Sequence, residues 1–243
     1  YKKKGYDKIP SRGYLAANTV PGTVSGWDAA HKYARANMSN AGLPWKDLFD
    51  SAILYSQKGF PVTASLARWE EINVDPKDSE FRNLQRFSGF KQTYLKPDGS
   101  PYKVGEIMKL PQLANTYKLI AEKGANEFYR GSIAKKIVAD LQKHGGVLTL
   151  NDFAKHTADW VEPLSVDYRG YKAYNLPPNT QGMASLEILN ILNNIDVKKL
   201  GEGTTDYYHV MVEATKQAFA DRDKYLTDPK EAKIPLDFLL SKQ

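Results

Sequence analysis

The sequence predicts an α+β fold that is mainly helical and contains one β-hairpin. Three observations support this prediction. Apolar residues recur at helical spacing through most of the chain, which is typical of amphipathic helices. Between residues 163 and 176 the apolar period changes to two, which is typical of strands. The stretch after Pro178 is apolar on nearly every side, so it predicts a helix that is buried on nearly every side.

Short helices are expected in the first part of the chain, because proline and glycine punctuate its apolar patterns. Residues 1–18 are irregular and polar. A helical pattern follows the Pro-Gly of VPGTVSGW, Pro44 opens a second helix that Gly59 ends, and Pro61 starts a third. The predicted helices therefore end near Ala34, Gly59 and Glu71. Residues 73–105 are the least regular part, and they contain a Pro-Asp-Gly turn.

The central helices have recognisable start and stop signals. Pro111 suits the first position of a helix, and Gly124 stops that helix. Ser132 is expected to cap the next helix, which Gly145-Gly146 close. Residues 149–152 predict a capping arrangement for a short helix.

The last third of the chain predicts the hairpin, a buried helix and a long helix. Leu164, Val166 and Tyr168 alternate with polar residues, and Arg169-Gly170 can form the turn. A long helix is expected over residues 205–226. No stretch reads as a linker, so we predict a single domain over residues 1–243. The buried helix should have its large apolar residues covered from both sides: Leu186, Ile188, Leu189, Ile191 and Leu192.

Composition excludes several classes of function. The chain has 243 residues, a net charge of +6 and no cysteine, so disulfides, thiolate catalysis and Cys-ligated zinc are excluded. No apolar run approaches the ~18 residues that a membrane span needs. The basic residues are spread along the chain and predict a solvated lysine-rich surface, with no nucleic-acid partner. The start YKKKGYDKIP lacks the apolar core of a signal peptide, and we expect a piece of a longer bacterial product. Periplasmic, secreted and cytoplasmic locations stay open.

No known catalytic motif is present. The sequence contains no P-loop, no Rossmann fingerprint and no Gly-x-Ser-x-Gly elbow. The four histidines are far apart, so no metal site is expected. Arg222 lies beside the apolar stripe of the long helix, and it is either an anion clamp or a tie between helices. The Gly203-Thr204-Thr205 sequence resembles the cut site of a self-processing hydrolase, but it is explained by helix capping.

Eight segments of the chain resemble, in order, segments of one protein family. They are similar to the large subunit of gamma-glutamyltransferases and the related cephalosporin-acylase-like proteins. The segments are VPGTVSGW (20–27), GFPV (59–62), LKPDGSPYKVGE (95–106), LPQLANTYKLIAEKGANEFYRG (110–131), GGVLTLNDF (145–153), WVEPLSVDYRGYKAYNLPP (160–178), QAFADRDKYLTDP (217–229) and LLSK (239–242).

The resemblance implies an N-terminal nucleophile (Ntn) hydrolase with four αββα layers, of which this chain is the mainly helical large-subunit part. It implies a precursor that cuts itself into two associated subunits. The N-terminal Thr of the small subunit then attacks a γ-glutamyl amide such as glutathione and forms an acyl-enzyme, without a metal or organic cofactor. In the family, this Thr would follow Gln243 and the Arg that binds the substrate carboxylate would precede Tyr1. The resemblance therefore assigns no catalytic residue to this chain.

One segment departs from the usual family pattern. Residues 177–182 read PPNTQG, where gamma-glutamyltransferases usually have Pro-Pro-Pro-Ser-Ser-Gly-Gly. This form is closer to the acylase-like branch, so a glutaryl or cephalosporin acylase is the first alternative. A non-catalytic module that binds a polymer is an alternative of another class. Asn179, Thr180 and Gln181 are candidates for lining the substrate site, or they form a purely structural loop.

Overall fold

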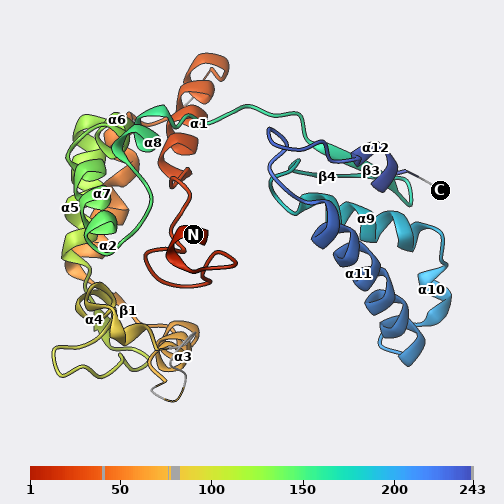
Figure 1. Cartoon of the computed structure of the whole chain (residues 1–243), viewed down its shortest axis with the longest axis horizontal. Helices are drawn as coiled ribbons and strands as arrows, with labels where there is room; N and C mark the ends of the chain where they lie inside the picture. The colour runs from red at the N-terminus through yellow and green to blue at the C-terminus, as the bar shows by residue number, and fades with distance from the viewer. Residues whose placement is uncertain (40–41, 76, 78–82, 242–243) are drawn as a thin grey trace. The chain divides into compact units, whose positions relative to one another are not determined.

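The computed structural model describes residues 1–39, 42–75, 77 and 83–241 (Figure 1). Contacts between residues divide the chain into two compact units, Tyr1–Ala158 and Asp159–Gln243. The single domain expected over residues 1–243 stays a prediction. No helix in the described ranges is long and apolar enough to cross a membrane.

The first unit is mainly helical and contains one short pair of strands. The strand pair is antiparallel, with Phe60 opposite Met108. The elements are η1 (Lys2–Lys4), α1 (Thr23–Asn37), η2 (Trp45–Phe49), α2 (Asp50–Lys58), β1 (Phe60–Pro61), α3 (Ala64–Asn73), η3 (Leu84–Arg86), α4 (Ser88–Tyr94), β2 (Ile107–Met108), α5 (Pro111–Lys123), α6 (Ala125–Tyr129), α7 (Ser132–Lys143) and α8 (Leu150–Lys155).

The core of this unit gathers apolar side chains from α1, η2 and the run of helices α5 to α8. Ala134 and Phe153 are completely buried there, and Ile120 is almost so. The indole of Trp45 packs beside them and donates a hydrogen bond of 2.9 Å to the carbonyl of Ile120. A buried indole N–H needs such a partner, so this bond fixes η2 against α5.

Several predicted helix boundaries in this unit are confirmed. Pro111 is the first residue of α5, and Gly124 follows its end with a φ of 77°. Thr149 accepts the N–H of Asp152, and the Asp152 carboxylate accepts the N–H of Thr149, which is a complete capping box. The stretch 44–59 is helical as expected, although it begins as the 3₁₀ helix η2 before it becomes α2.

Two predicted helix starts are wrong. Pro61 lies in β1, and α3 begins at Ala64 because the side chain of Thr63 accepts the N–H of Leu66. Ser132 is already inside α7, whose N-cap is Gly131. Its N–H donates to the carboxylate of Glu127 at 2.8 Å, so a side chain from the preceding helix satisfies this terminus.

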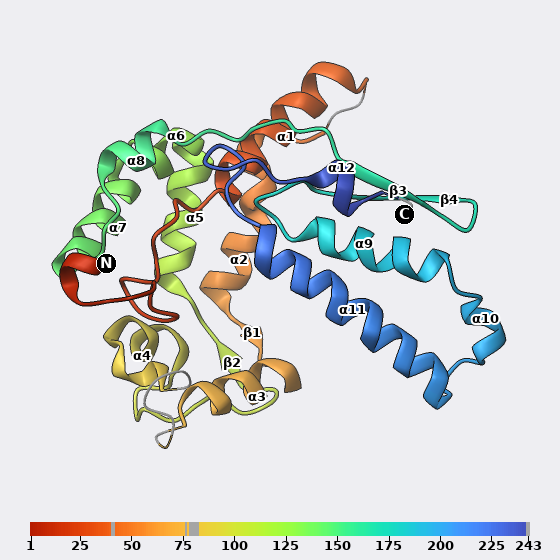
Figure 2. The ribbon, with the colours of Figure 1, turned by 45° about the vertical axis from the view of Figure 1, so that its right-hand side comes forward.

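The second unit combines the expected hairpin with two long helices. Its elements are β3 (Leu164–Tyr168), β4 (Tyr171–Asn175), α9 (Gly182–Asn193), α10 (Val197–Leu200), α11 (Thr205–Tyr225) and α12 (Leu236–Leu239) (Figure 2). Arg169 and Gly170 form the turn with φ angles of 51° and 87°. Positive φ at both central residues is what a tight hairpin turn with the strand twist needs.

Helix α9 lies between α11 and the hairpin, so α11 covers one side of it and the hairpin covers another. Met183, Ala184 and Leu186 are buried, and so is Leu192 near the end of the helix. The other three residues that we expected to be covered, Ile188, Leu189 and Ile191, are only half-buried. The prediction of burial on nearly every side is thus confirmed for Leu186 and Leu192 and wrong for these three residues.

Helix α11 begins where the capping interpretation places it. The hydroxyl of Thr204 accepts the N–H of Tyr207 at 3.2 Å. This hydroxyl is also 2.7 Å from the carbonyl of Leu200, to which it donates. Helix capping therefore accounts for this Thr-Thr pair.

Candidate functional site

The loop that connects β4 to α9, residues 176–181, is held tightly by its own polar groups. The hydroxyl of Thr180 is within hydrogen-bond distance of two carbonyls, those of Leu176 at 3.1 Å and Pro177 at 3.0 Å. The Asn175 side chain accepts the N–H of Leu176 and donates to Ser185 in α9. A methyl group on Gly182 would collide with the carbonyl of Leu176, so the loop needs glycine at this position.

The three predicted site residues lie together in this loop and are exposed, but their side chains differ in freedom. Thr180 uses its hydroxyl inside the loop. Gln181 accepts a hydrogen bond of 3.1 Å from Arg222 in α11. Asn179 makes no side-chain hydrogen bond with any residue in the described ranges, so it is the one most free to contact a ligand. Their role in binding stays a prediction.

Arg222 connects this loop to α11. Besides its bond to Gln181, it donates to one oxygen of Asp223 at 2.9 and 2.7 Å, and its guanidinium lies 3.9 Å from the ring centre of Phe219. An arginine that is already paired with a carboxylate has little charge and few N–H donors left to bind a substrate anion. Of the two interpretations that the sequence left open, this geometry favours the tie between elements.

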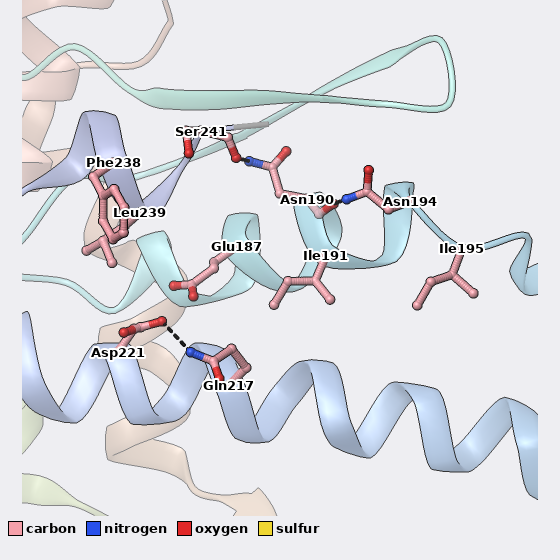
Figure 3. A pocket seen from close by; sticks show the side chains of 10 residues that line it. All are labelled: Glu187, Asn190, Ile191, Asn194, Ile195, Gln217, Asp221, Phe238, Leu239 and Ser241. Carbon is pink, nitrogen blue, oxygen red and sulfur yellow. Dashed lines mark hydrogen bonds between the residues drawn. The ribbon is translucent and has the colours of Figure 1, made fainter. Parts of the chain in front are cut away.

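A pocket of about 470 Å³ lies beside α9, α11 and α12 (Figure 3). Figure 3 shows the carboxyl groups of Glu187 on α9 and Asp221 on α11 turned toward each other. Asp221 accepts a hydrogen bond of 2.9 Å from Gln217 one turn earlier. The polar side chains that line the pocket are mostly acids and amides: Glu187, Asn190, Asn194, Gln217, Asp221 and Ser241.

Glu187 is the unusual group of this pocket. Its side chain belongs to a residue that is only 5% exposed, and its Oε2 has no hydrogen-bond partner among the described residues. Burial, a hydrogen bond with Asp221 and the charge of Asp221 raise the pKa of Glu187 to about 8. A carboxyl in such a place keeps its proton at neutral pH, since burial disfavours the charged form.

Our sequence analysis missed this carboxyl pair. One member of the pair could have been found from the sequence, because Glu187 is the only charged residue in the apolar run MASLEILNIL. The other member, Asp221, could not have been found in this way, because it lies 34 residues away on a helix with many charges. Only the packing of α9 on α11 brings the two together.

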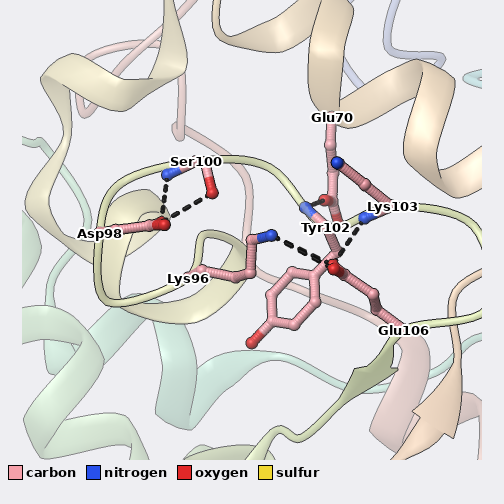
Figure 4. A network of polar contacts seen from close by, with 7 residues as sticks. All are labelled: Glu70, Lys96, Asp98, Ser100, Tyr102, Lys103 and Glu106. Atoms are coloured by element: carbon pink, nitrogen blue, oxygen red, sulfur yellow. Dashed lines mark hydrogen bonds and ion pairs between the residues drawn. The ribbon is translucent and has the colours of Figure 1, made fainter.

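A second polar network stabilises a turn in the first unit (Figure 4). Asp98 accepts both the N–H and the hydroxyl of Ser100, which confirms the predicted turn. Glu106 accepts the N–H of Lys103 and binds the ammonium of Lys96 at 3.2 Å; these contacts lower its pKa. The buried Glu70 accepts the N–H of Tyr102, and its burial raises its pKa. Each carboxylate here serves the loop backbone.

One serine and one histidine of the first unit lie at hydrogen-bond distance. The Oγ of Ser25 is 2.9 Å from Nε2 of His156 and 2.7 Å from the carbonyl of Gly22. Both contacts lie at the N-terminal end of α1. The pair fixes the start of α1. In the described ranges, no group of three or more His, Cys, Asp or Glu could hold a metal ion.

Comparison with known proteins identifies the family. The sequence model of gamma-glutamyltranspeptidase matches residues 1–243. The chain belongs to the gamma-glutamyltranspeptidase family. Among curated relatives, it is 42% identical to the glutathione hydrolase-like YwrD proenzyme of Bacillus subtilis strain 168. That match covers 99% of this chain and 43% of the relative. It is also 38% identical to the glutathione hydrolase proenzyme of Escherichia coli K12, with 94% of this chain and 37% of that protein covered.

Solved structures of this family have the same fold. The cephalosporin acylase from Bacillus halodurans matches with a TM-score of 0.83 and 37% identity, over 99% of this chain and 43% of that one. The gamma-glutamyltranspeptidase of Helicobacter pylori matches with a TM-score of 0.82 and 31% identity, over 98% of this chain and 64% of that one. The predicted fold class is confirmed: the chain matches the mainly helical large-subunit part of the Ntn-hydrolase fold, with its β-hairpin. It spans less than half the length of these curated relatives.

Proposed function

We propose that the protein to which this chain belongs hydrolyses or transfers γ-glutamyl groups from amides such as glutathione. The observation that supports this most is the family match over residues 1–243. Several relatives are named glutathione hydrolase proenzymes, and they match more than nine tenths of this chain. The relatives reported above are named as enzymes, which is why we do not retain the polymer-binding alternative.

In the proposed reaction, the attacking group is an N-terminal Thr on the small subunit of the same precursor. Its hydroxyl adds to the γ-carbonyl of the substrate, the amide C–N bond breaks, and the amine leaves with the hydroxyl proton. Water or an acceptor amine then opens the resulting ester and regenerates the hydroxyl. This chain contributes the helical layer around the site. The name proenzyme of several relatives supports the cutting step.

The test uses the protein at full length. Purified precursor should split into two fragments on standing, and the split form should release p-nitroaniline from γ-glutamyl-p-nitroanilide. The variant Thr204→Ala is a matched control, because Thr204 only caps α11; it should split and turn over substrate as before. A precursor that stays whole, or a split protein without activity on γ-glutamyl amides, would contradict the proposal.

An acylase activity is the second candidate, and one observation favours it: residues 177–182 read PPNTQG. Glutaryl-p-nitroanilide differs from the γ-glutamyl compound only in lacking the α-amino group. A kcat/KM at least tenfold higher for the glutaryl compound would favour the acylase, and the reverse ratio would favour the γ-glutamyl enzyme.

Within this function, the loop before α9 is proposed to touch the substrate through Asn179. Its side chain is exposed and makes no hydrogen bond in the described part of the chain. Asn179→Ala should therefore raise KM and leave the melting temperature unchanged. Thr180→Val is the contrasting variant, since it removes bonds inside the loop and should lower the melting temperature. An unchanged KM in Asn179→Ala would reduce the loop to a structural role.

A further inference from the structure

The pocket beside Glu187 and Asp221 has the chemistry of a cation site. Two carboxyl groups and three amide side chains line it, and its lining includes no Lys, Arg or His. Asn190 uses its amide N–H₂ to bind the carbonyls of Leu240 and Ser241, which leaves its carbonyl oxygen as an acceptor. The polar wall therefore offers mainly hydrogen-bond acceptors, and Asp221 adds negative charge, which suits a ligand that donates hydrogen bonds.

The burial of Glu187 is a further feature of this pocket. This carboxyl group is nineteen-twentieths buried in the chain, lines the pocket, and has one oxygen without any partner in the described ranges. Buried polar atoms in folded proteins almost always have a partner, so an orphan of this kind indicates a missing donor. A proton shared with Asp221 is one donor that can satisfy it, and an ammonium group is another.

The rest of the pocket limits which cation fits. Its other walls are the apolar side chains of Ile191, Ile195, Phe238 and Leu239. A hydrated metal ion would gain nothing from these walls, and the described residues hold no cluster of three metal-ligating groups. A carboxylate on the ligand would be repelled by Asp221, and it would find no Lys, Arg or His in the lining. The cavity of about 470 Å³ is within the usual range for small ligands.

We propose that this pocket binds a small primary alkylammonium ion, with its charged head between Glu187 and Asp221 and its alkyl chain on the apolar wall. An ammonium group has three donors, which matches acceptors from the two carboxyl groups and a neighbouring amide. This site is separate from the γ-glutamyl reaction proposed above and does not depend on it.

The proton on Glu187 should make ammonium binding at this site depend on pH. Burial and Asp221 raise the pKa of Glu187 to about 8, so at neutral pH an arriving ammonium displaces a proton. Asp221 is the charged group that faces Glu187 from α11, and α9 has no other titratable residue. Affinity should therefore rise between about pH 6 and pH 8 and then level off, while an alkylammonium keeps its charge until about pH 10.

The experiment is calorimetric titration of the full-length protein with n-butylamine, n-butanol and butyrate. Butylamine should bind at least about tenfold more tightly than the alcohol, which has the same chain but no charge, and butyrate should not bind. Titration in two buffers of different ionisation enthalpy should detect proton release with the amine at neutral pH.

Variants test whether Glu187 and Asp221 are responsible for the binding of butylamine and for the proton release. Glu187→Gln and Asp221→Asn should each weaken butylamine binding by about tenfold and abolish the proton release. Glu213→Gln removes the same charge from the exposed surface of α11, where Glu213 pairs with Lys216, and should bind as before. Equal affinity for amine and alcohol in the unaltered protein would overturn the proposal without any variant, and so would unchanged binding in Glu187→Gln.

Discussion

At the scale of single residues, Glu187 should make the stability of the fold depend on pH. Its pKa is about 8 in the folded chain and near 4.5 in a model peptide. Because the folded state holds the proton more strongly, this group stabilises the fold fully below about pH 4.5, and this stabilisation declines as pH rises toward 8. The decline is at most about 1.4 kcal/mol per pH unit.

Glu187→Gln should remove this pH dependence. The amide cannot ionise, and it can still donate a hydrogen bond to Asp221. The variant should be more stable than the unaltered protein by about 1–3 kcal/mol near pH 8 and about equal to it near pH 5. Urea unfolding at both pH values measures the difference. Parallel profiles for the two proteins would mean that Glu187 titrates normally in the fold.

The bond between Arg222 and Gln181 is the second residue-scale feature with a measurable energy. A double-mutant cycle with Arg222→Ala and Gln181→Ala should give a coupling of about 0.5–1.5 kcal/mol in unfolding free energy. The control cycle pairs Arg222→Ala with Asp223→Asn, whose carboxylate is exposed; the coupling should be less than about 1 kcal/mol. Zero coupling in the first cycle would show that the loop is not tied to α11 through this bond.

Individual residues also show what a sequence can and cannot predict. Thr149 and Thr204 were predictable as caps, because a cap and its partner lie within three residues of each other. Ser132 was not, since Glu127 from the preceding helix satisfies that terminus instead. The carboxyl pair at the pocket depends on which helices meet, and nothing local to either residue encodes that.

At the scale of elements, the loop between β4 and α9 is a tightly constrained connection. Gly182→Ala would place a methyl group against the carbonyl of Leu176 and the side chain of Asn175. The loop would have to shift, and the unfolding free energy should fall by about 1–3 kcal/mol.

Gly26→Ala is the matched control for this glycine. A methyl group there meets open space on α1, and alanine is the better helix former, so a gain of about 0.5–1 kcal/mol is expected. Thermal or urea unfolding of both variants makes the comparison. A Gly182→Ala protein as stable as the original would show that the loop has room to move.

Element type was easier to predict than element boundaries. The hairpin, its Arg169-Gly170 turn and the long helix α11 follow from period and turn chemistry, and all are confirmed. Pro61 misled the prediction because proline suits both a helix start and a short edge strand, and the partner strand lies 46 residues further along. The half-burial of Ile191 likewise depends on tertiary neighbours.

At the scale of the whole molecule, the proposed function places the nucleophile outside these 243 residues. The chain produced alone should therefore release no p-nitroaniline from γ-glutamyl-p-nitroanilide, whereas the full-length protein after splitting should do so. Assays at equal molar concentration make the comparison direct. Turnover by the chain alone, after removal of any companion, would refute this assignment of the nucleophile.

The β3–β4 ribbon has a consequence for handling such a chain. Within the described ranges these two strands pair only with each other, so each presents one row of backbone N–H and C=O groups without a strand neighbour. Exposed rows of this kind are templates for intermolecular pairing. Tyr171 and Tyr174 on β4 are largely exposed and add apolar surface to the ribbon. When produced separately, the polypeptide should consequently tend toward strand-mediated aggregation, and co-expression with the remaining segments should improve its solubility.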